Sequence, residues 1–342
     1  MPVDEMPVKV PLMSRGTAST VAICTAWILG GCTPQQGTTA AGTQPARVYA
    51  ASPGGLSVWD LGTSREGQVT GIVCWSDARL APDGFSVLFS VEMPGEEGIW
   101  SVPIGVADGV LGRSVPWEEV RTHATRLTRD LTDRDPALSP DGSTLAFGRQ
   151  GRIALLHLGS HELEFVTPAN PPFDRVGRIR MLGDLFPTWS PSGAQILYTL
   201  GEEEEAPQLR LADLARGTNR QLTHAEVGEA GTHSGVWSPA GTVIAAVRNN
   251  MPTPPYVPCG DLQEGHLVFI DAVSGADIAL WPGTRVEQLV CWTPEGDGVV
   301  FYADGGLYLT RFPEGWGGDR MVVSRAASDV GGGLAIGWQG GP

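Results

Sequence analysis

Lysine is almost absent from this sequence, because Lys9 is the single lysine among 342 residues. A chain without lysine after its first residues has neither a Schiff-base lysine nor the lysine of a phosphate-binding loop. The sequence also lacks the Gly-x-Ser-x-Gly pattern, which excludes the sharp turn that carries the nucleophile of α/β-hydrolases. The common catalytic groups of these three enzyme classes are therefore not encoded.

Helical periodicity is scarce as well. The 46 glycines and 27 prolines are too many for a helical protein and instead predict many short strands joined by turns. With 42% hydrophobic residues, the chain is apolar enough to bury a large core. The predicted fold class is all-β.

Positive charge is also in short supply, since 23 basic residues face 38 acidic ones and give a net charge of −15. Such a surface cannot neutralise a phosphate backbone, so we expect no nucleic-acid partner. The charge favours cations, basic proteins or neutral ligands, or it serves only to keep the protein soluble.

The N-terminal segment has the features of an export signal. The apolar run 21–29 follows Arg15 and is too short to span a bilayer, but it suits the core of a signal peptide. It ends in Leu29-Gly-Gly-Cys32, which resembles the bacterial lipobox, where cleavage leaves a lipid-bearing cysteine. We therefore predict a lipoprotein signal at residues 1–31, for which Met13 would be a cleaner start, and lipid attachment at Cys32. The alternative is an ordinary apolar segment that ends in Gly-Cys by chance.

Residues 32–46 have the small, polar composition of a flexible tether. Export would leave Cys74, Cys259 and Cys291 in an oxidising compartment. Cys259 and Cys291 are the better disulfide pair because they fall in neighbouring repeats, although buried thiols are the alternative. No His/Cys spacing suggests zinc, and no cofactor is predicted.

From residue 47 onward the chain repeats one pattern, which consists of a short apolar strand, a Ser-Pro-x-Gly turn or a relative of it, and an alternating strand. Proline presets the backbone of the turn, and the glycine two residues later accepts a positive φ. The turn glycines are Gly84, Gly142, Gly193, Gly241 and Gly296. An aromatic residue precedes most of these turns (Trp75, Trp189, Trp237 and Trp292) and is predicted to pack between neighbouring sheets rather than to form a ligand cage.

Two further strands follow in each unit, and the last of them ends in a motif such as Arg126-Leu-Thr128 or Gln221-Leu-Thr223. Four strands per unit with a period of about 50 residues indicate a β-propeller. The pattern resembles the WD-like repeats of TolB-type translocation proteins and of the propellers in prolyl oligopeptidases. The N-terminal α/β domain of the former and the hydrolase domain of the latter have no counterpart in this sequence. The resemblance therefore implies the propeller fold, but neither a role in Tol translocation nor peptidase activity.

The two ends of the repeat region complement each other. Residues 47–70 contain three strands without a first one, and residues 333–338 contain a first strand with nothing after it. Joined, they form one blade and leave no open sheet edge at the seam of the ring. Together with five complete units, this predicts a six-bladed propeller of four-stranded blades over residues 47–342, closed by N-terminal strands that pair with a C-terminal strand.

One face of this propeller has the longer loops, and loops on a rigid scaffold usually carry binding sites. Residues just before each first strand should surround the mouth of the central channel on that face, namely Asp133, Arg134, Asp135, Asp184, His233 and Gln288. Such a ring could hold a metal ion, a peptide terminus or a saccharide. Alternatively, it caps backbone groups and lines a water-filled channel.

These observations predict a monomeric, non-catalytic binding or scaffolding propeller in the bacterial cell envelope. The N-terminal lipid would anchor it to a membrane, facing the periplasm or the exterior, and its partner would be a protein, peptide or saccharide. The alternative is a propeller enzyme, a metal-assisted polysaccharide lyase or hydrolase with His233, Asp135 and Asp184 as metal ligands at the channel mouth.

Overall fold

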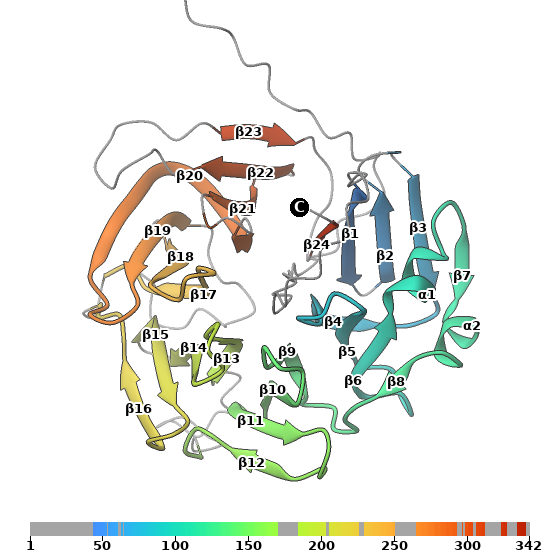
Figure 1. Cartoon of the computed structure of the whole chain (residues 1–342), viewed down its shortest axis with the longest axis horizontal. Coiled ribbons are helices and arrows are strands. Elements are labelled where there is room, and N and C mark those ends of the chain that lie inside the picture. Colours follow the sequence, from blue (N-terminus) through green and yellow to red (C-terminus); the bar gives the residue numbers. More distant parts are fainter. Residues whose placement is uncertain are drawn as a thin grey trace, which may run out of the picture.

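The computed structural model describes residues 44–52, 54–60, 63, 65–169, 184–202, 205–225, 229–249, 265–292, 296, 298–303, 306–311, 323–326 and 334–339. The predicted signal peptide and Cys32, the predicted site of lipid attachment, lie outside these residues. Antiparallel sheets surround a central axis as the blades of a propeller, which confirms the predicted fold class (Figure 1).

The first blade joins the two ends of the described chain. Its strands, from the centre outward, are β24 (Leu334–Gln339), β1 (Gln44–Ser52), β2 (Gly55–Asp60) and β3 (Arg65–Thr70). Strand β24 runs antiparallel to β1, with Ile336 opposite Val48 and Ala335 opposite Tyr49. The predicted closure of the ring is therefore present.

The next three blades each follow the order of the chain from the centre outward. Blade 2 contains β4 (Cys74–Leu80), β5 (Ser86–Val91), β6 (Gly98–Pro103) and β8 (Thr125–Arg126). Blade 3 contains β9 (Arg134–Leu138), β10 (Thr144–Arg149), β11 (Arg152–His157) and β12 (Leu163–Phe165). Blade 4 contains β13 (Asp184–Trp189), β14 (Gln195–Glu202), β15 (Glu205–Asp213) and β16 (Thr218–Gln221).

Blades 5 and 6 share one long strand. They contain β17 (Thr232–Trp237), β18 (Val243–Asn249), β19 (Gly265–Asp271), β20 (Asp277–Trp292), β21 (Gly298–Ala303), β22 (Gly306–Arg311) and β23 (Val323–Ala326). The first part of β20 pairs with β19 and the second part pairs with β21. Strand β20 is therefore the outermost strand of blade 5 and the innermost strand of blade 6, and the ring has six blades.

The three Ser-Pro-x-Gly turns and their two relatives, Ala81-Pro-Asp-Gly84 and Thr293-Pro-Glu-Gly296, share the predicted positive φ, which is 71° or 72° at all five glycines. In blade 3 the N–H of Gly142 donates to the Ser139 carbonyl at 2.8 Å. The Ser139 hydroxyl accepts a hydrogen bond from the N–H of Thr144 at 3.0 Å, and Ser190 and Ser238 accept equivalent bonds in blades 4 and 5. The serine therefore closes the hairpin, a role that the sequence did not predict.

Trp189 and Trp292, which precede two of the turns, pack between blades as predicted, whereas the side chain of Trp75 lies outside the described part of the structure. The indole N–H of Trp189 donates to the carbonyl of Ala137 in the preceding blade at 2.9 Å. Trp292 donates in the same way to Val236 at 3.1 Å. Each indole therefore links two neighbouring inner strands through a hydrogen bond as well as through apolar contact.

The threonine that ends each fourth-strand motif also has a repeated role. The N–H of Ile99, the second residue of β6, donates to Thr128 Oγ1 at 2.9 Å. The N–H of Ile153 in β11 donates to Thr167 Oγ1 at 3.0 Å. These hydroxyls satisfy a buried backbone donor of the third strand just beyond the end of the fourth strand.

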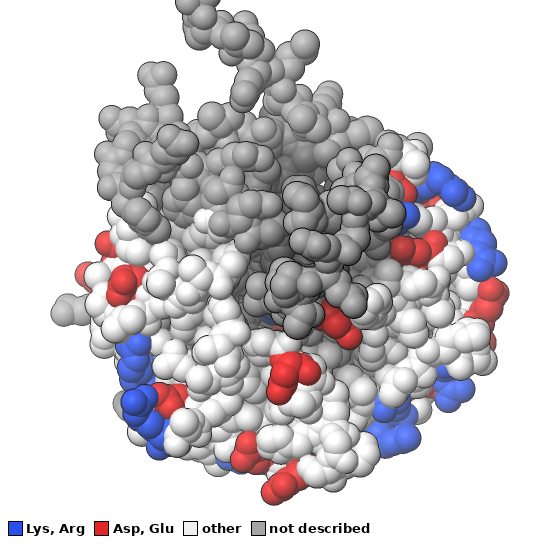
Figure 2. Space-filling model, in the orientation of Figure 1, with Lys and Arg blue, Asp and Glu red and all other residues white. Residues whose placement is uncertain are grey.

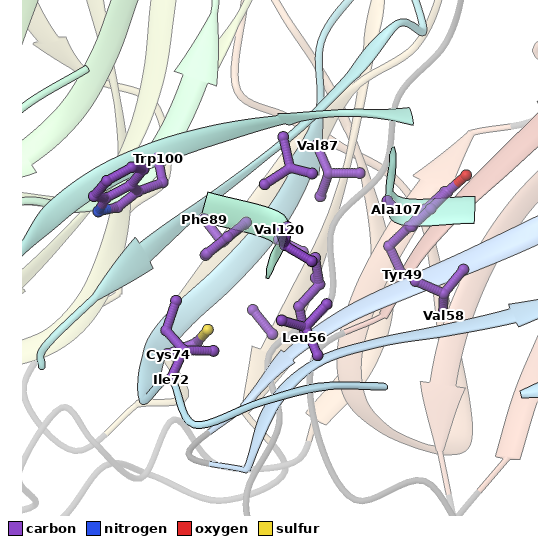
Figure 3. Close-up of a cluster of buried hydrophobic side chains, with 14 of the residues drawn as sticks. Tyr49, Leu56, Val58, Ile72, Cys74, Val87, Phe89, Trp100, Ala107 and Val120 are labelled. Carbon is purple, nitrogen blue, oxygen red and sulfur yellow. The ribbon is translucent and has the colours of Figure 1, made fainter. Parts of the chain in front are cut away.

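An insertion between β6 and β8 departs from the repeat. It forms helix α1 (Ile104–Asp108), strand β7 (Ser114–Pro116) and helix α2 (Trp117–Arg121), where the sequence predicted no element. Strand β7 pairs in parallel with β3, with Val115 opposite Val69, so the sheet of blade 1 has a fifth strand. Figure 3 shows the apolar cluster where the insertion meets blades 1 and 2, formed by residues such as Tyr49, Val58, Phe89, Trp100, Ala107 and Val120.

Candidate functional site at one end of the channel

The predicted channel-mouth residues lie on or next to innermost strands. Arg134 and Asp135 begin β9, directly after Asp133. Asp184 begins β13, His233 is the second residue of β17, and Gln288 lies in the second part of β20. Arg134 pairs with Gly148 in β10, at the end of the hairpin opposite to the Ser-Pro-x-Gly turn. The side chains of Asp184 and Gln288 lie outside the described part of the structure.

Asp133 is buried and has a partner within its own blade. Arg149 donates from Nε and Nη2 to the two carboxylate oxygens of Asp133, both at 2.6 Å. Only 2% of Asp133 is exposed, so this bidentate pair neutralises a carboxylate that would be costly to bury alone. Asp133 therefore fixes the connection between blades 2 and 3 at the channel end.

Three consecutive blades share an unusual backbone conformation at this end. Asp135, Phe186 and Ser234 occupy equivalent positions in β9, β13 and β17, and each has a φ of 53°. The pairing of each strand with its neighbour shifts register at this position. A positive φ is uncommon for residues other than glycine, and β-bulges redirect side chains near functional sites. The bulge therefore places specific side chains at one end of the innermost strands, where the mouth of the channel was predicted.

Hydrogen bonds connect these bulges from blade to blade. The N–H of Phe186 faces Asp135 Oδ2 at 3.4 Å, and the N–H of Ser234 donates to Thr199 Oγ1 at 3.1 Å. The Nδ1 atom of His233 lies 2.9 Å from the Ser234 hydroxyl. Asp135 is 2% exposed and His233 is 1% exposed, so a carboxylate and an imidazole are both buried along this part of the ring.

Glu92 is a residue of this region that the sequence did not single out. It follows β5, and its N–H donates to the Val73 carbonyl at 3.0 Å. Partial burial raises the pKa of the Glu92 carboxyl, and the positive charge of Arg134 partly opposes this rise. The charge of Arg134 at the start of blade 3 therefore acts on Glu92 at the end of the second strand of blade 2.

The loop after Glu92 is held tightly by blade 2. Arg126 donates to the carbonyls of Gly95 at 2.8 Å and Glu97 at 2.9 Å, and its guanidinium lies over the ring of Trp100. The indole N–H of Trp100 donates to the Glu96 carbonyl at 2.7 Å. Hydrogen bonds from the backbone N–H groups of Gly95 and Glu97 lower the pKa of the Glu97 carboxyl, which stays charged in solution. These hydrogen bonds therefore hold the loop that follows Glu92 in one conformation.

Charge is distributed unevenly over the face shown in Figure 2. Basic side chains lie along the circumference, whereas acidic side chains also lie close to the centre, over β4 and β9. Asp83 and Asp141 are exposed residues in the turns that follow these two strands. The turn face is therefore acidic near the axis of the ring, and it is the face opposite to the predicted channel-mouth residues.

Within the described ranges, no three His, Cys, Asp or Glu side chains are grouped so that they could hold a metal ion. Cys74 and Cys291 are both buried, and Cys259 lies outside the described residues, so the disulfide between Cys259 and Cys291 stays a prediction. The two described helices contain five residues each, which is too few to cross a membrane.

Solved structures with this fold include TolB from Acinetobacter baumannii, with a TM-score of 0.56, 16% identity, and coverage of 86% of this chain and 67% of that chain. A putative TolB from Agrobacterium tumefaciens has a TM-score of 0.50, 16% identity, and coverage of 80% and 92%. A chain of a nidogen/laminin complex has a TM-score of 0.55, 10% identity, and coverage of 85% and 98%. No family model and no curated protein matches the sequence. Identities this low show the fold alone, and this chain has a TolB-like β-propeller fold.

Proposed function

We propose that this chain is an exported, lipid-anchored protein of the bacterial cell envelope that binds a partner without catalysing a reaction. The partner would bind at the channel end formed by the start of β9, β13 and β17. The observation that carries the proposal is the positive-φ bulge at Asp135, Phe186 and Ser234, which recurs in three consecutive blades beside buried polar groups. Backbone strain and buried ionisable groups cost stability, and in proteins they gather at functional sites.

The half-buried groups at this end suit a polar partner. Arg134 can donate several hydrogen bonds to a carboxylate or hydroxyl, and Glu92 can accept them from an amine or hydroxyl. Both side chains are partly accessible, whereas Asp133 and Asp135 are almost fully buried. A protein segment, a peptide terminus or a saccharide has the matching chemistry, and the rigid ring would bind it with little loss of conformational freedom.

Capture of partners from solubilised membranes tests this proposal. We expect a double variant, Glu92→Gln with Arg134→Gln, to lose most of the captured partner because both charges at the channel end are removed. A matched control, Glu118→Gln with Arg216→Gln, makes the same chemical changes at exposed positions on α2 and beside β16. Unchanged capture by the channel-end variant, or an equal loss in the control, would contradict the proposal.

Metal analysis of the purified protein separates binding from the enzymatic alternative. A non-catalytic propeller should contain no stoichiometric metal, and the variants His233→Ala and Asp135→Ala should not change its metal content. A bound metal that is lost in both variants would instead support a metal-assisted lyase or hydrolase at the same channel end.

Lipid attachment at Cys32 has a separate test. The substitution Cys32→Ser removes the thiol that would carry the lipid, so the protein should move from the membrane fraction to the soluble fraction. Cys74→Ser serves as the control, because Cys74 lies in β4 within the ring and should not affect membrane retention. If the Cys32→Ser protein stays with the membrane, the lipobox interpretation is wrong.

A further inference from the structure

The backbone of the insertion between β6 and β8 lies directly against the backbone of β3, the outer strand of blade 1. The N–H of Gly112 donates to the Glu66 carbonyl at 2.7 Å, and the N–H of Gln68 donates to the Arg113 carbonyl at 3.1 Å. A Cβ atom on Gly67 would lie 2.1 Å from the Val110 carbonyl oxygen, so this approach of two backbones requires glycine at position 67. The contact is therefore specific to this pair of segments.

Apolar side chains of the insertion fill the space between blades 1 and 2. Trp117 is 1% exposed, and its ring lies edge-on to Trp100 at 5.2 Å and to Phe89 at 6.1 Å between centroids. Ala107 and Val120 belong to the same buried cluster as Tyr49, Leu56 and Val58 of blade 1 (Figure 3). One continuous core therefore includes both blades and the insertion.

A polar contact joins the insertion to the strand that closes the ring. The hydroxyl of Tyr49 in β1 donates to Asp108 Oδ1 at 2.7 Å, at the end of α1. Arg47, also in β1, lies 3.6 Å from the same carboxylate and forms an ion pair with Asp60 of β2 at 2.5 Å. Tyr49 is 1% exposed, so its hydroxyl would be costly to separate from this acceptor.

We propose that residues 104–124 act as a clasp that makes β1, β2 and β3 open and close as one unit with blade 2. The clasp contacts β1 through Asp108, β2 through the shared core and β3 through backbone hydrogen bonds. Local opening in proteins follows such groups of mutually dependent contacts rather than single strands. The strands nearest the predicted tether are therefore held by an element that does not depend on β24.

Hydrogen exchange of the full chain, measured by mass spectrometry, tests the clasp. The variant Tyr49→Phe removes one hydroxyl and preserves the ring. We expect exchange in residues 47–70 and 104–124 to accelerate together, by on the order of tenfold for a lost buried hydrogen bond to a carboxylate. Peptides of blades 3, 4 and 5 should keep their exchange rates. The matched control is Tyr198→Phe in β14, which removes a buried hydroxyl from blade 4, where the clasp makes no described contact.

Three outcomes would overturn the proposal. Exchange could accelerate in residues 104–124 alone, which would mean that the insertion opens without the strands. It could accelerate equally in all blades, which would mean that no local unit exists, or it could fail to change. A second variant, Gly67→Ala, acts on the other side of the clasp through the carbonyl of Val110 and should accelerate the same two segments.

Discussion

The junction between blades 1 and 2 differs in kind from the junctions between blades 3, 4 and 5. Blades 3 to 5 are linked by apolar clusters of their own strands and by hydrogen bonds between repeat residues, such as Trp189 to Ala137, Asn219 to Val166 and Arg220 to Ala272. Blades 1 and 2 instead share an inserted segment with its own helices, strand and buried aromatic ring. A repeated fold can therefore be joined in one place by repeat contacts and in another by a segment outside the repeat.

Truncation of the aromatic side chains should show this difference most strongly. We expect Trp117→Ala to lower the free energy of unfolding by about 3–5 kcal/mol, because the ring is fully buried against Trp100 and Phe89. The half-buried Trp189 should cost less when it is replaced by alanine. Urea denaturation of both variants measures the difference, with the exposed Phe85→Ala as a control that should change little. Equal losses for Trp117 and Trp189 would contradict the distinction between the two kinds of junction.

Replacing the repeated threonine should cost a similar unfolding free energy in blade 2, which contacts the clasp, and in blade 3, which belongs to the other kind of junction. Thr128→Val in blade 2 and Thr167→Val in blade 3 each remove the acceptor of a buried N–H, of Ile99 and Ile153 respectively. Each valine variant should lose about 1–2 kcal/mol of unfolding free energy. The corresponding serine variants keep the hydroxyl acceptor and should lose much less. A much larger loss for Thr128 than for Thr167, measured by the same denaturation, would show that the clasp amplifies repeat contacts in blade 2.

The smallest expected effect concerns pH and Asp108. Burial raises the pKa of the Asp108 carboxyl and outweighs the lowering by the Tyr49 hydroxyl and Arg47, while the Asp60 carboxylate raises it further. A raised folded-state pKa gives a stabilisation that is complete below the ordinary value for aspartate and is lost as pH rises through the raised value. As pH rises from the ordinary aspartate pKa to the raised pKa of Asp108, the unfolding free energy of the wild type should therefore fall relative to that of Asp108→Asn, which does not titrate at this position. Denaturation of both proteins across this range measures the effect, and parallel pH profiles would contradict it.

The sequence predicted those parts of the fold that depend on local signals. Each Pro-x-Gly turn marks a hairpin through residues that act within four positions, and the tryptophan before it marks the inner strand. The complementary ends of the repeat region were enough to predict that β24 would pair with β1. Repetition makes each weak local signal visible several times, which is why blade number and closure could be inferred.

The clasp and the bulges could not be inferred in this way. Helices α1 and α2 have five residues each, too few to display a helical period, and Gly67 in β3 was the one local trace of the close backbone approach. The positive φ of Phe186 was also hidden, because phenylalanine has no preference for that conformation. The effect of the Arg134 charge on the pKa of Glu92 depends on how two blades meet, and no single blade encodes it.

The closure of the ring also has a consequence for biosynthesis. Strand β24 is made long after β1, and contacts between distant parts of a chain form late during folding. Until β24 arrives, the inner edge of β1 has no partner and could pair with another nascent chain. The outer edge of β3 is covered much earlier, because β7 is synthesised soon after β6, with only α1 and a short loop between them. A growing chain of this protein therefore exposes one strand edge of its first blade to aggregation rather than two.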